Sequence, residues 1–581
     1  MRHYQLIETP EPLGEIAQRL SDQRAIGVDT ETTGLDPFTS RVRLLQLASP
    51  EEVFILDLFH LPAAALAPIK RILETERPVK VLHHAKFDIK MLRHHFGIEI
   101  DPLFDTMLAS QLISAGDLNQ RQGLADLAER YLGRRLDKSL HQSQWAGSLT
   151  PAMLTYAAED AAILLPLRER LIEEIKSWQL VRVAKLEFDC VLPTAAMELA
   201  GLYLDRDCWQ RLIEHLEGER DRLEGELKRA LVSPEQDRDL FGEASINLNS
   251  PQQVREALSR LGIPVANTRE LELGSFADRY PIVGQLIRYR HVQKLLSAYG
   301  RSLLEHVHPV TGRIHADFRQ IGTPTGRFSC SGPNVQQVPN IPEVRACFKA
   351  SPGKKLVVAD YSQIELCILA EFSHDARMVE AFLSGVDLHR STASLMFNVP
   401  IDSVTKEQRA VAKTLNYGLL YGMGTQALAA RTGTTLSEAE ALMKRYFSIY
   451  QGVARWLRAA ADTAVSIGHS RTHWGRVWKF RFDPTDRRQV DAVRRLGKNA
   501  PIQGTSADIL KRAMRLVYEA LRGRDAQIVN SIHDELVVEV DEAIADEVAE
   551  IVSQRMVAAA QEFIRIVPVN VDVSVAEAWL K

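Results

Sequence analysis

The chain has 581 residues, of which 45 % are hydrophobic and 25 % are charged, a composition that excludes a largely disordered protein. At roughly 100–200 residues per domain, this length predicts three or more structural units. The formal net charge of −4 argues against nucleic-acid binding through overall positive charge, so such binding would need a local basic groove on an acidic body.

Basic side chains are concentrated in three segments. Each is as compatible with a solvated helix face as with a nucleic-acid contact. The segments contain Arg288, Arg290 and Lys294; Arg471, Arg476, Lys479 and Arg481; and Arg487, Arg488, Arg494, Arg495 and Lys498.

The cysteine content and the N-terminus indicate a cytoplasmic protein. The five cysteines form no Cys-x-x-Cys pair, which favours a reducing compartment and no zinc site. Residues Met1–Leu13 are polar, and no run of about 18 apolar residues occurs, so neither a secretory signal nor a transmembrane helix is predicted.

The first 180 or so residues predict an α/β layer domain. Strands are expected at Ala25–Asp29, Val42–Ala48 and Val53–Leu56, and a long helix at Pro151–Trp178. Asp29 and Glu31 alternate at the end of the first strand, so both side chains can point to one spot. Paired carboxylates are unfavourable unless a cation neutralises them, which indicates a hard-metal site, although an isolated Asp-x-Glu is common by chance.

Further acidic residues strengthen this interpretation. Asp88 begins a helical pattern, and Tyr156 and Asp160 share one face of the long helix. Together with Asp29 and Glu31, these residues resemble the three exonuclease motifs of the DEDD superfamily in its Tyr-containing form. The resemblance implies an RNase H-like 3′-5′ exonuclease in which Asp29, Glu31, Asp88 and Asp160 hold two metal ions and Tyr156 orients the attacking water.

One position departs from the family pattern. Many proofreading members have Asn four residues before the second-motif Asp, where this chain has His84. We expect this difference to affect the positioning of the DNA strand and not the metal ligands.

From Ala184 to Arg301 the pattern is helical and amphipathic. Ser250-Pro251-Gln252-Gln253 predicts a helix start with a Ser N-cap, Pro at the first helical position and a capping box. Beyond it, Lys355–Asp360 is predicted to be a buried strand that ends in an aspartate.

A second set of motifs lies in the C-terminal 400 residues. Residues 375–470 are helix-rich, and Arg409, Lys413, Tyr417 and Tyr421 recur every four residues, forming one stripe on a helix. A half-buried, salt-bridged helix would show the same spacing, but the glycines after both tyrosines favour close approach of backbone or bases. Gln527–Ile532 and Leu536–Val540 predict a hairpin whose turn is His533-Asp534-Glu535.

In this order, the strand ending at Asp360, the stripe and the hairpin resemble motifs A, B and C of the family A DNA polymerases of the bacterial polymerase I type. The segments Thr325-Gly-Arg327-Phe-Ser and Asn499-Ala-Pro-Ile-Gln503-Gly-Thr extend the resemblance. It implies an α/β (α+β) multidomain protein, with an exonuclease domain at 1–180 and a right-hand polymerase domain at 181–581. Within the latter, the thumb is expected at about 185–310, the palm at about 311–375 and 500–581, and the fingers at about 376–499.

The resemblance assigns roles to the residues of the polymerase motifs. Asp360 and Asp534 would hold two metal ions, Mg²⁺ or else Mn²⁺, and Glu535 would be an accessory acid. Arg409 and Lys413, with Arg345 and His389, would contact the triphosphate. Glu365 would block a 2′-hydroxyl, Tyr421 would stack near the nascent base pair, and Gln363 would also contact the nucleotide. The expected primer–template contacts are Arg327, Arg495, Asn499, Gln503 and His533.

Two positions vary within the family. Tyr417 stands where many bacterial members have Phe, and its hydroxyl can replace the missing 3′-hydroxyl of a dideoxynucleotide, so efficient use of chain terminators is expected. Cys367 stands where Arg is frequent, so one basic contact in the palm is in doubt.

These features predict a monomeric polymerase with 3′-5′ proofreading that uses primer–template DNA and dNTPs, in a bacterial cytoplasm or a phage-infected host. The family's separate 5′ nuclease domain is not represented, which with Tyr417 favours a phage-like or stand-alone replicative role over repair. One alternative is an enzyme that is mainly a 3′-5′ exonuclease, with the polymerase part as a docking platform. Another is a non-catalytic primer–template binding protein. The retained Asp360, Lys413 and Asp534 argue against the first alternative, since a docking platform does not need them, and the second predicts DNA binding with neither degradation nor extension.

Overall fold

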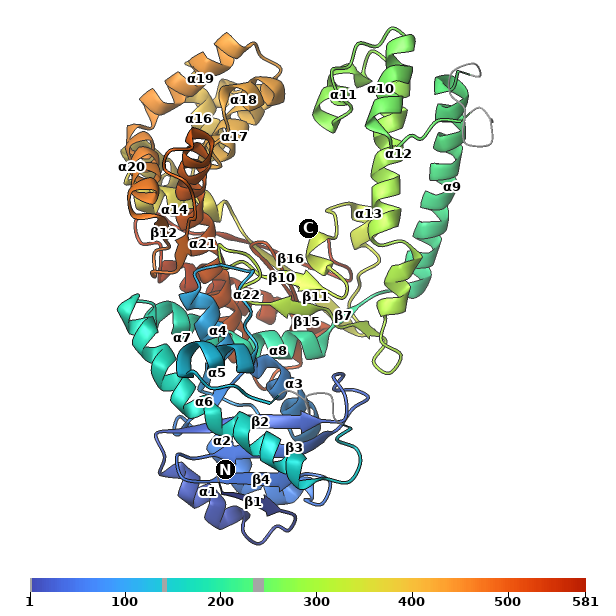
Figure 1. Ribbon diagram of the computed structural model, residues 1–581. Helices are drawn as coiled ribbons and strands as arrows, with labels where there is room; N and C mark the ends of the chain where they lie inside the picture. Colours follow the sequence, from blue (N-terminus) through green and yellow to red (C-terminus); the bar gives the residue numbers. More distant parts are fainter. Residues whose placement is uncertain (1–2, 138–143, 234–244, 581) are drawn as a thin grey trace.

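The structure is a computed structural model that describes residues 3–137, 144–233 and 245–580. Residues 234–244 of the expected thumb therefore lie outside the described part. The N-terminal part is one layered α/β unit, and the C-terminal part has a sheet with two groups of helices on opposite sides of it (Figure 1).

The N-terminal unit is built on a mixed six-stranded sheet of order β1-β4-β3-β2-β5-β6, in which β3 is antiparallel to its neighbours and the other pairs are parallel. Its strands are β1 (Tyr4–Ile7), β2 (Ala25–Thr32), β3 (Val42–Ala48), β4 (Val53–Asp57), β5 (Val79–Leu82) and β6 (Leu103–Asp105). Its helices are α1 (Leu13–Ser21), α2 (Ala67–Glu74), α3 (Ala85–Phe96), α4 (Thr106–Ile113), α5 (Leu124–Leu132) and α6 (Pro151–Ser177). The strands and the long helix expected from the sequence are confirmed.

Helix α6 lies directly on β2 because Gly27 leaves room for it. A Cβ atom at Gly27 would stand 2.2 Å from the carbonyl oxygen of Ala161, so only glycine allows this approach. Strand β2 carries Asp29 and Glu31, and α6 carries Asp160. The close packing therefore brings the first and third exonuclease motifs together.

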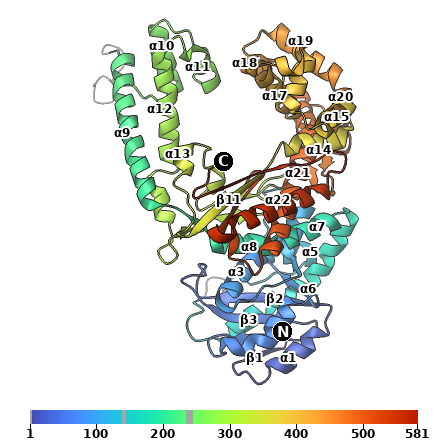
Figure 2. The same cartoon turned by 180° about the vertical axis from the view of Figure 1, so that it is seen from behind.

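The C-terminal part contains an antiparallel four-stranded sheet of order β14-β15-β11-β16. The strands are β11 (Lys354–Tyr361), β14 (Ala526–Ile532), β15 (Glu535–Asp541) and β16 (Val571–Ala576). Helices α21 (Arg487–Leu521) and α22 (Ala545–Gln561) pack together beside the sheet (Figure 2). The predicted hairpin is confirmed, with its turn at His533 and Asp534, since Glu535 already pairs with Ile532.

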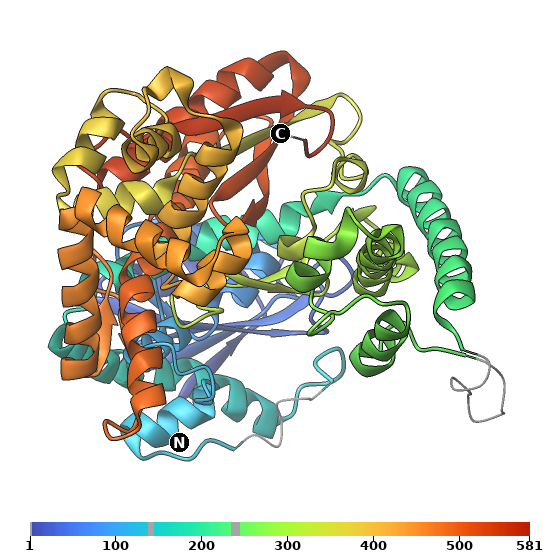
Figure 3. The ribbon, with the colours of Figure 1, turned by 90° about the horizontal axis from the view of Figure 1, so that it is seen from above.

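Two groups of helices rise from this sheet on opposite sides (Figures 1 and 3). One group contains α9 (Arg206–Leu231), α10 (Pro251–Arg260), α11 (Glu270–Ala277) and α12 (Pro281–Ala298). The other contains α14 (Ile364–Ser373), α15 (Ala376–Leu383), α16 (Leu388–Phe397), α17 (Lys406–Leu420), α18 (Thr425–Thr432), α19 (Leu436–Ile449) and α20 (Gln451–Ile467). The arrangement is that of a right hand, and our ranges for palm, fingers and thumb stay predictions.

Other short elements connect these parts of the described chain. They are α7 (Val181–Asp189), α8 (Val191–Ala200) and α13 (Pro342–Arg345), with the strand pairs β7 (Leu202–Tyr203) and β8 (Arg313–Ile314), β9 (Asp317–Arg319) and β10 (Ser329–Ser331), and β12 (His469–Arg471) and β13 (Val477–Lys479). Strand β7 interrupts the segment that we expected to be helical from 184 to 301.

Two local expectations were wrong. Ser250 caps α10 by accepting from the Gln253 N–H at 3.4 Å, but the Gln253 side chain accepts from the Asn247 N–H instead of the Ser250 N–H, so no capping box forms. Arg476 is not available to a nucleic acid, because it is 4 % exposed and pairs with Glu187 and Asp508.

Buried ion pairs join the N-terminal unit to the rest of the chain. Lys86 of α3 donates to Glu198 of α8 at 2.6 Å and to Asp317 of β9 at 2.7 Å, and Lys90 donates to the other oxygen of Glu198 at 2.6 Å. Because Lys86 and Glu198 are 6 % and 4 % exposed, this cluster fixes α3 against the C-terminal part.

None of the helices within the described ranges is long and apolar enough to cross a membrane.

Candidate active sites

The first cluster of acidic residues forms where β2, α3 and α6 meet. Strand β2 supplies Asp29 and Glu31, the first turn of α3 supplies Asp88, and α6 supplies Asp160. The hydroxyl of Thr30, also on β2, donates to Asp88 Oδ1 at 2.6 Å and so holds α3 against the strand. The four expected metal ligands are therefore brought to one place.

The electrostatics of this cluster favour a bound cation. Burial is the main cause that raises the pKa of Asp29 well above its usual value, and the charges of Asp88, Glu31 and Asp160 add to it. Burial, with Asp160 and Asp88, raises the pKa of Glu31 to about 8, and burial raises the pKa of Asp88 to about 7. Oxygen donors that repel one another in this way fit a hard divalent ion.

Tyr156 lies one helical turn before Asp160 on α6 and is half-buried against Trp145, with ring centroids 6.5 Å apart. Burial raises its pKa, and the charge of Asp160 and a hydrogen bond to that carboxylate raise it further. Its hydroxyl therefore stays protonated and can hold a water or a carboxylate in a fixed orientation.

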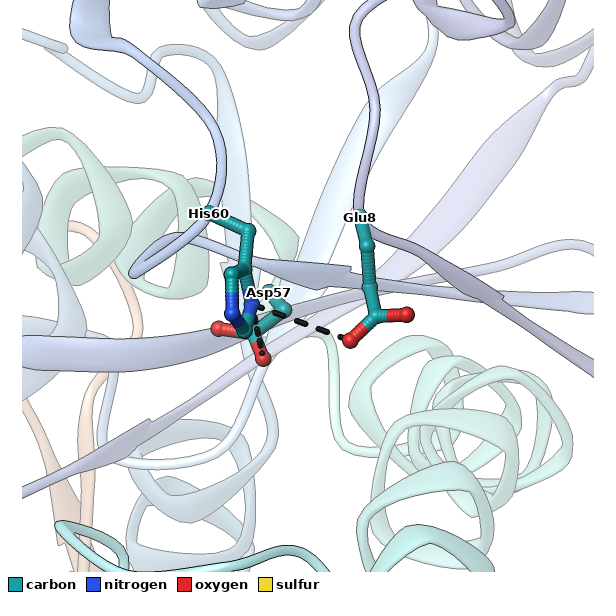
Figure 4. Close-up of side chains that lie close together, drawn as sticks. All are labelled: Glu8, Asp57 and His60. Atoms are coloured by element: carbon teal, nitrogen blue, oxygen red, sulfur yellow. Dashed lines mark hydrogen bonds and ion pairs between the residues drawn. The ribbon is translucent and has the colours of Figure 1, made fainter.

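A different group has the tightest arrangement of possible ligand atoms. Among the described residues, Glu8, Asp57 and His60 are the three whose ligand atoms all lie within 4.8 Å of one another (Figure 4). Asp57 is already neutralised by Arg43 at 2.7 Å and accepts from the Phe59 N–H at 3.0 Å. A metal ion would have to displace Arg43, so we interpret this group as an ion-paired turn.

The second acidic cluster forms at one end of the C-terminal sheet. Asp360 is near the end of β11, opposite Glu535 of β15 and Asp572 of β16. Asp534 is in the adjacent turn, and its carbonyl accepts from the Tyr361 N–H at 3.2 Å. The charge of Asp360 contributes to the raised pKa of Asp534, after burial as the main cause. Asp360 and Asp534 are thus neighbours, and two carboxylates fit a divalent cation.

Ser506 supports Asp534 from α21. Its hydroxyl donates to Asp534 Oδ1 at 2.7 Å, which fixes one carboxylate oxygen. Ser506 could not be identified from the sequence, because nothing in the local pattern of α21 indicates which strand turn it meets.

Glu535 has a different environment from its neighbour in the hairpin. It is 2 % exposed, accepts from the indole N–H of Trp579 at 2.6 Å and lies 3.8 Å from the Arg345 guanidinium. Arg345 also lies over the Trp579 ring, 4.4 Å from its centroid. Burial lowers the pKa of Arg345, and the charges of Glu535 and Asp360 oppose that shift. Glu535 therefore orients Arg345 here, and its role as an accessory acid stays a prediction.

The stripe of motif B lies on α17, as expected. Arg409 pairs with Asp387 at 2.6 Å, whereas Lys413 is exposed and has no partner among the described residues. The His389 ring is 5.7 Å from that of Tyr417, and burial lowers the pKa of His389 to about 4, so this imidazole is neutral at pH 7. Asn416, which has no distinguishing signal in the sequence, contacts His389 Nδ1 at 2.9 Å.

Tyr417 and Tyr421 both lie near acidic side chains. Burial raises the pKa of Tyr417 to about 12, and the charges of Glu365, Asp534 and Asp360 contribute, so its hydroxyl stays protonated close to the second acidic cluster. Tyr421 donates a short hydrogen bond to Glu365.

Glu365 forms the centre of a small polar group. It is 5 % exposed and accepts from Arg327 at 2.7 Å as well as from Tyr421. Burial raises its pKa, and both partners oppose that shift. This group brings an expected sugar-discriminating acid together with an expected primer–template contact.

The remaining expected contacts surround this region. Asn499 donates from α21 to the Tyr421 carbonyl at 3.3 Å, and Arg495 packs against Gly422, where a Cβ would lie 3.3 Å from its Cγ. Gln503 is half-buried on the same helix. Gln363 precedes α14 and His533 is in the hairpin turn, both with a positive φ of 57° and 51°.

Family models match both parts of the chain. The model for DNA polymerase family A matches residues 215–581, and the model for a 3′-5′ exonuclease matches residues 4–176. The first match covers more than half of the chain.

Individual relatives agree with these matches. The chain is 32 % identical to DNA polymerase I of Aquifex aeolicus over the full length of both proteins. It is 34 % identical to DNA polymerase I of Pseudomonas aeruginosa, with 97 % of this chain and 64 % of that protein covered. A solved structure, the POL domain of Pol1 from M. smegmatis in complex with DNA primer-template and dNTP, is 29 % identical and superposes with a TM-score of 0.85 over 99 % of both chains.

The prediction of a polymerase of this type with a proofreading nuclease is thereby confirmed. The chain belongs to DNA polymerase family A, as a DNA-directed DNA polymerase of the bacterial polymerase I type that also carries a 3′-5′ exonuclease domain.

Proposed function

We propose that both activities of this chain depend on pairs of divalent metal ions, generally Mg²⁺, held by the two acidic clusters. The observation that carries the proposal is that acids from distant segments converge twice, with Asp360 beside Asp534 in one place and Asp29 beside Asp88 and Asp160 in the other. Such ions stabilise the attacking and the leaving oxygens of phosphoryl transfer.

In the polymerase site, side chains of this protein position the incoming dNTP. Lys413, exposed on α17, and Arg409 beside it are suited to the negative charge of a dNTP triphosphate. For Arg409 this requires exchange of Asp387 for phosphate. Glu365, held by Arg327 and Tyr421, forms a fixed wall against a 2′-hydroxyl.

In the exonuclease site, Asp29, Glu31, Asp88 and Asp160 would hold the ions, and protonated Tyr156 would orient the water that attacks the terminal phosphate. The partners that we propose are primer–template DNA and dNTPs, as in the M. smegmatis complex, with the protein acting as a monomer.

A primer-extension assay with a 5′-labelled primer tests this proposal. With Mg²⁺ and four dNTPs the primer should lengthen, with Mg²⁺ alone it should shorten, and with EDTA it should do neither. Extension that persists at full rate in EDTA would contradict the metal dependence.

A further inference from the structure

Two cysteine thiols are in contact at the base of the long helix α9. Cys208 Sγ and Cys347 Sγ lie 2.6 Å apart, although 139 residues separate them in the chain. Two thiols at this distance overlap, and an S–S bond is only about 0.6 Å shorter. Cys208 is in the first turn of α9, and Cys347 follows α13.

Backbone hydrogen bonds hold both cysteines in place. The Asp205 N–H donates to the Cys347 carbonyl at 2.9 Å, and the Lys349 N–H donates to the Tyr203 carbonyl at 3.2 Å. The Asp205 side chain also accepts from the Cys208 N–H at 2.9 Å, which caps α9. Because the two segments pair directly, a bond between the sulfurs would require little movement.

The other three cysteines have separate environments. Cys190 Sγ contacts the Thr194 hydroxyl, Cys330 Sγ donates to the Pro333 carbonyl, and Cys367 Sγ lies 4.0 Å from the Pro568 carbonyl. The contact between Cys208 and Cys347 is therefore specific to this pair.

We propose that Cys208 and Cys347 are a covalent modification site, at which a peroxide converts the two thiols into a reversible disulfide that ties α9 to the segment leading into β11. Cys208 is the half-buried thiol and the one that a small oxidant reaches, whereas Cys347 is 0 % exposed. Burial also raises the pKa of Cys347, so this thiol stays protonated and reacts second.

The reaction balances with hydrogen peroxide as the oxidant. The Cys208 sulfur attacks the peroxide O–O bond, forming a sulfenic acid and releasing water. The Cys347 sulfur then attacks the Cys208 sulfur, the S–OH bond breaks, and the hydroxyl leaves with the Cys347 proton as a second water. Two thiols are oxidised and one peroxide is reduced to two waters, and a dithiol reverses the change.

The disulfide should stabilise the protein without blocking catalysis. It would close a loop of 139 residues, which restricts the unfolded chain, so Tm of the C-terminal part should rise by on the order of 5 °C. Because the sulfurs are already in contact, Asp360 and Asp534 should keep their arrangement and primer extension should be retained.

Intact-mass spectrometry of the full-length protein tests the proposal. After removal of reductant and treatment with hydrogen peroxide, the mass should fall by about 2 Da, and a maleimide should then label three of the five cysteines in denatured protein. Proteolysis should give a linked peptide containing Cys208 and Cys347 that dithiothreitol separates. The rise in Tm should disappear with the same reductant.

Variants separate this site from general oxidation. Cys208→Ser should neither cross-link nor gain stability, and Cys347→Ala should leave a Cys208 sulfenic acid that dimedone traps. Cys330→Ser, the matched control, should cross-link like the wild type. Five labelled cysteines, oxidation of Cys208 to sulfinic acid in the wild type, or a link to another cysteine or another chain would each overturn the proposal.

Discussion

Glu198 connects the two enzymatic parts of the chain, and its substitution tests whether the polymerase part positions the exonuclease. It lies on α8 and accepts from Lys86 and Lys90 of α3 and from the Phe318 N–H, each at 2.6 Å. Helix α3 also carries Asp88 in its first turn. Glu198→Gln keeps the shape of the side chain but removes its charge.

The expected magnitude follows from these contacts. Breaking a buried ion pair by removing one partner costs about 3–5 kcal/mol, and a hydrogen bond to a charged group contributes about 1.5–3 kcal/mol. In the variant, Lys86 still has Asp317 as an ion-pair partner at 2.7 Å. The Lys90 side chain is already 19 % exposed, so water can hydrate its ammonium group. We therefore expect Glu198→Gln to lower the free energy of unfolding by about 3 kcal/mol, the lower end of this range.

Glu198→Gln should reduce degradation much more than extension. A shift of α3 by about 1 Å would move Asp88, and misplacement of that size can reduce a rate about 100-fold. Degradation of a labelled single strand should therefore fall at least about tenfold. Extension should be retained, because the side-chain hydrogen bonds of Glu198 go to α3 and to the Phe318 N–H, and not to the residues around Asp360 and Asp534.

Parallel assays of degradation, extension and Mg²⁺ dependence decide the matter. Glu198→Gln should raise the Mg²⁺ concentration needed for half-maximal degradation and leave that for extension unchanged. Glu305→Gln, at an exposed position of the same part, is the control and should change neither. Equal losses of both activities, or no loss of either, would refute the reasoning.

Three other perturbations test residues of α17 and of the two acidic clusters. Tyr417→Phe should reduce the use of dideoxynucleotides relative to deoxynucleotides by roughly ten- to a hundredfold, as expected for loss of a hydrogen bond to a charged group; an unchanged ratio in single-nucleotide kinetics would show that the hydroxyl is not involved. Ser506→Ala should raise the pKa of Asp534 and shift the acid limb of the extension rate to higher pH, because Asp534 loses its donor at 2.7 Å; an unshifted profile would contradict this. In EDTA, thermal stability should fall as pH rises from about 5 to about 8. Folding raises the pKa of Glu31 to about 8 and that of Asp88 to about 7. The folded state therefore binds protons more tightly than the unfolded state in this window, and it loses stability as those protons dissociate. Asp160→Asn should flatten that slope, and stability that increases over the window would refute the assignment.

The convergence of the acids into two clusters could be predicted from the sequence because each acid lies on an element with clear periodicity, whereas their catalytic role stays a prediction. Asp29 and Asp360 follow buried strand patterns, and Asp160 is one turn from Tyr156 on a long helix. Their order along the chain was enough to identify both motif sets.

The contacts that join distant elements could not be predicted in the same way. The pairing of Glu198 with Lys86 depends on how two units pack, and neither residue has a local signal for the other. Ser506 meets Asp534 only because α21 crosses beside the hairpin. The orientation of the Glu535 side chain could not be predicted either, since its hydrogen-bond donor is the indole N–H of Trp579, near the end of the chain.

We propose above that the two separate acidic clusters support two separate reactions. The most direct measurement is extension and degradation by Asp360→Ala and Asp160→Ala proteins whose folding has been verified by thermal unfolding. We expect Asp360→Ala to abolish extension and retain degradation, and Asp160→Ala to do the reverse. Loss of both activities from either single substitution in folded protein would contradict it.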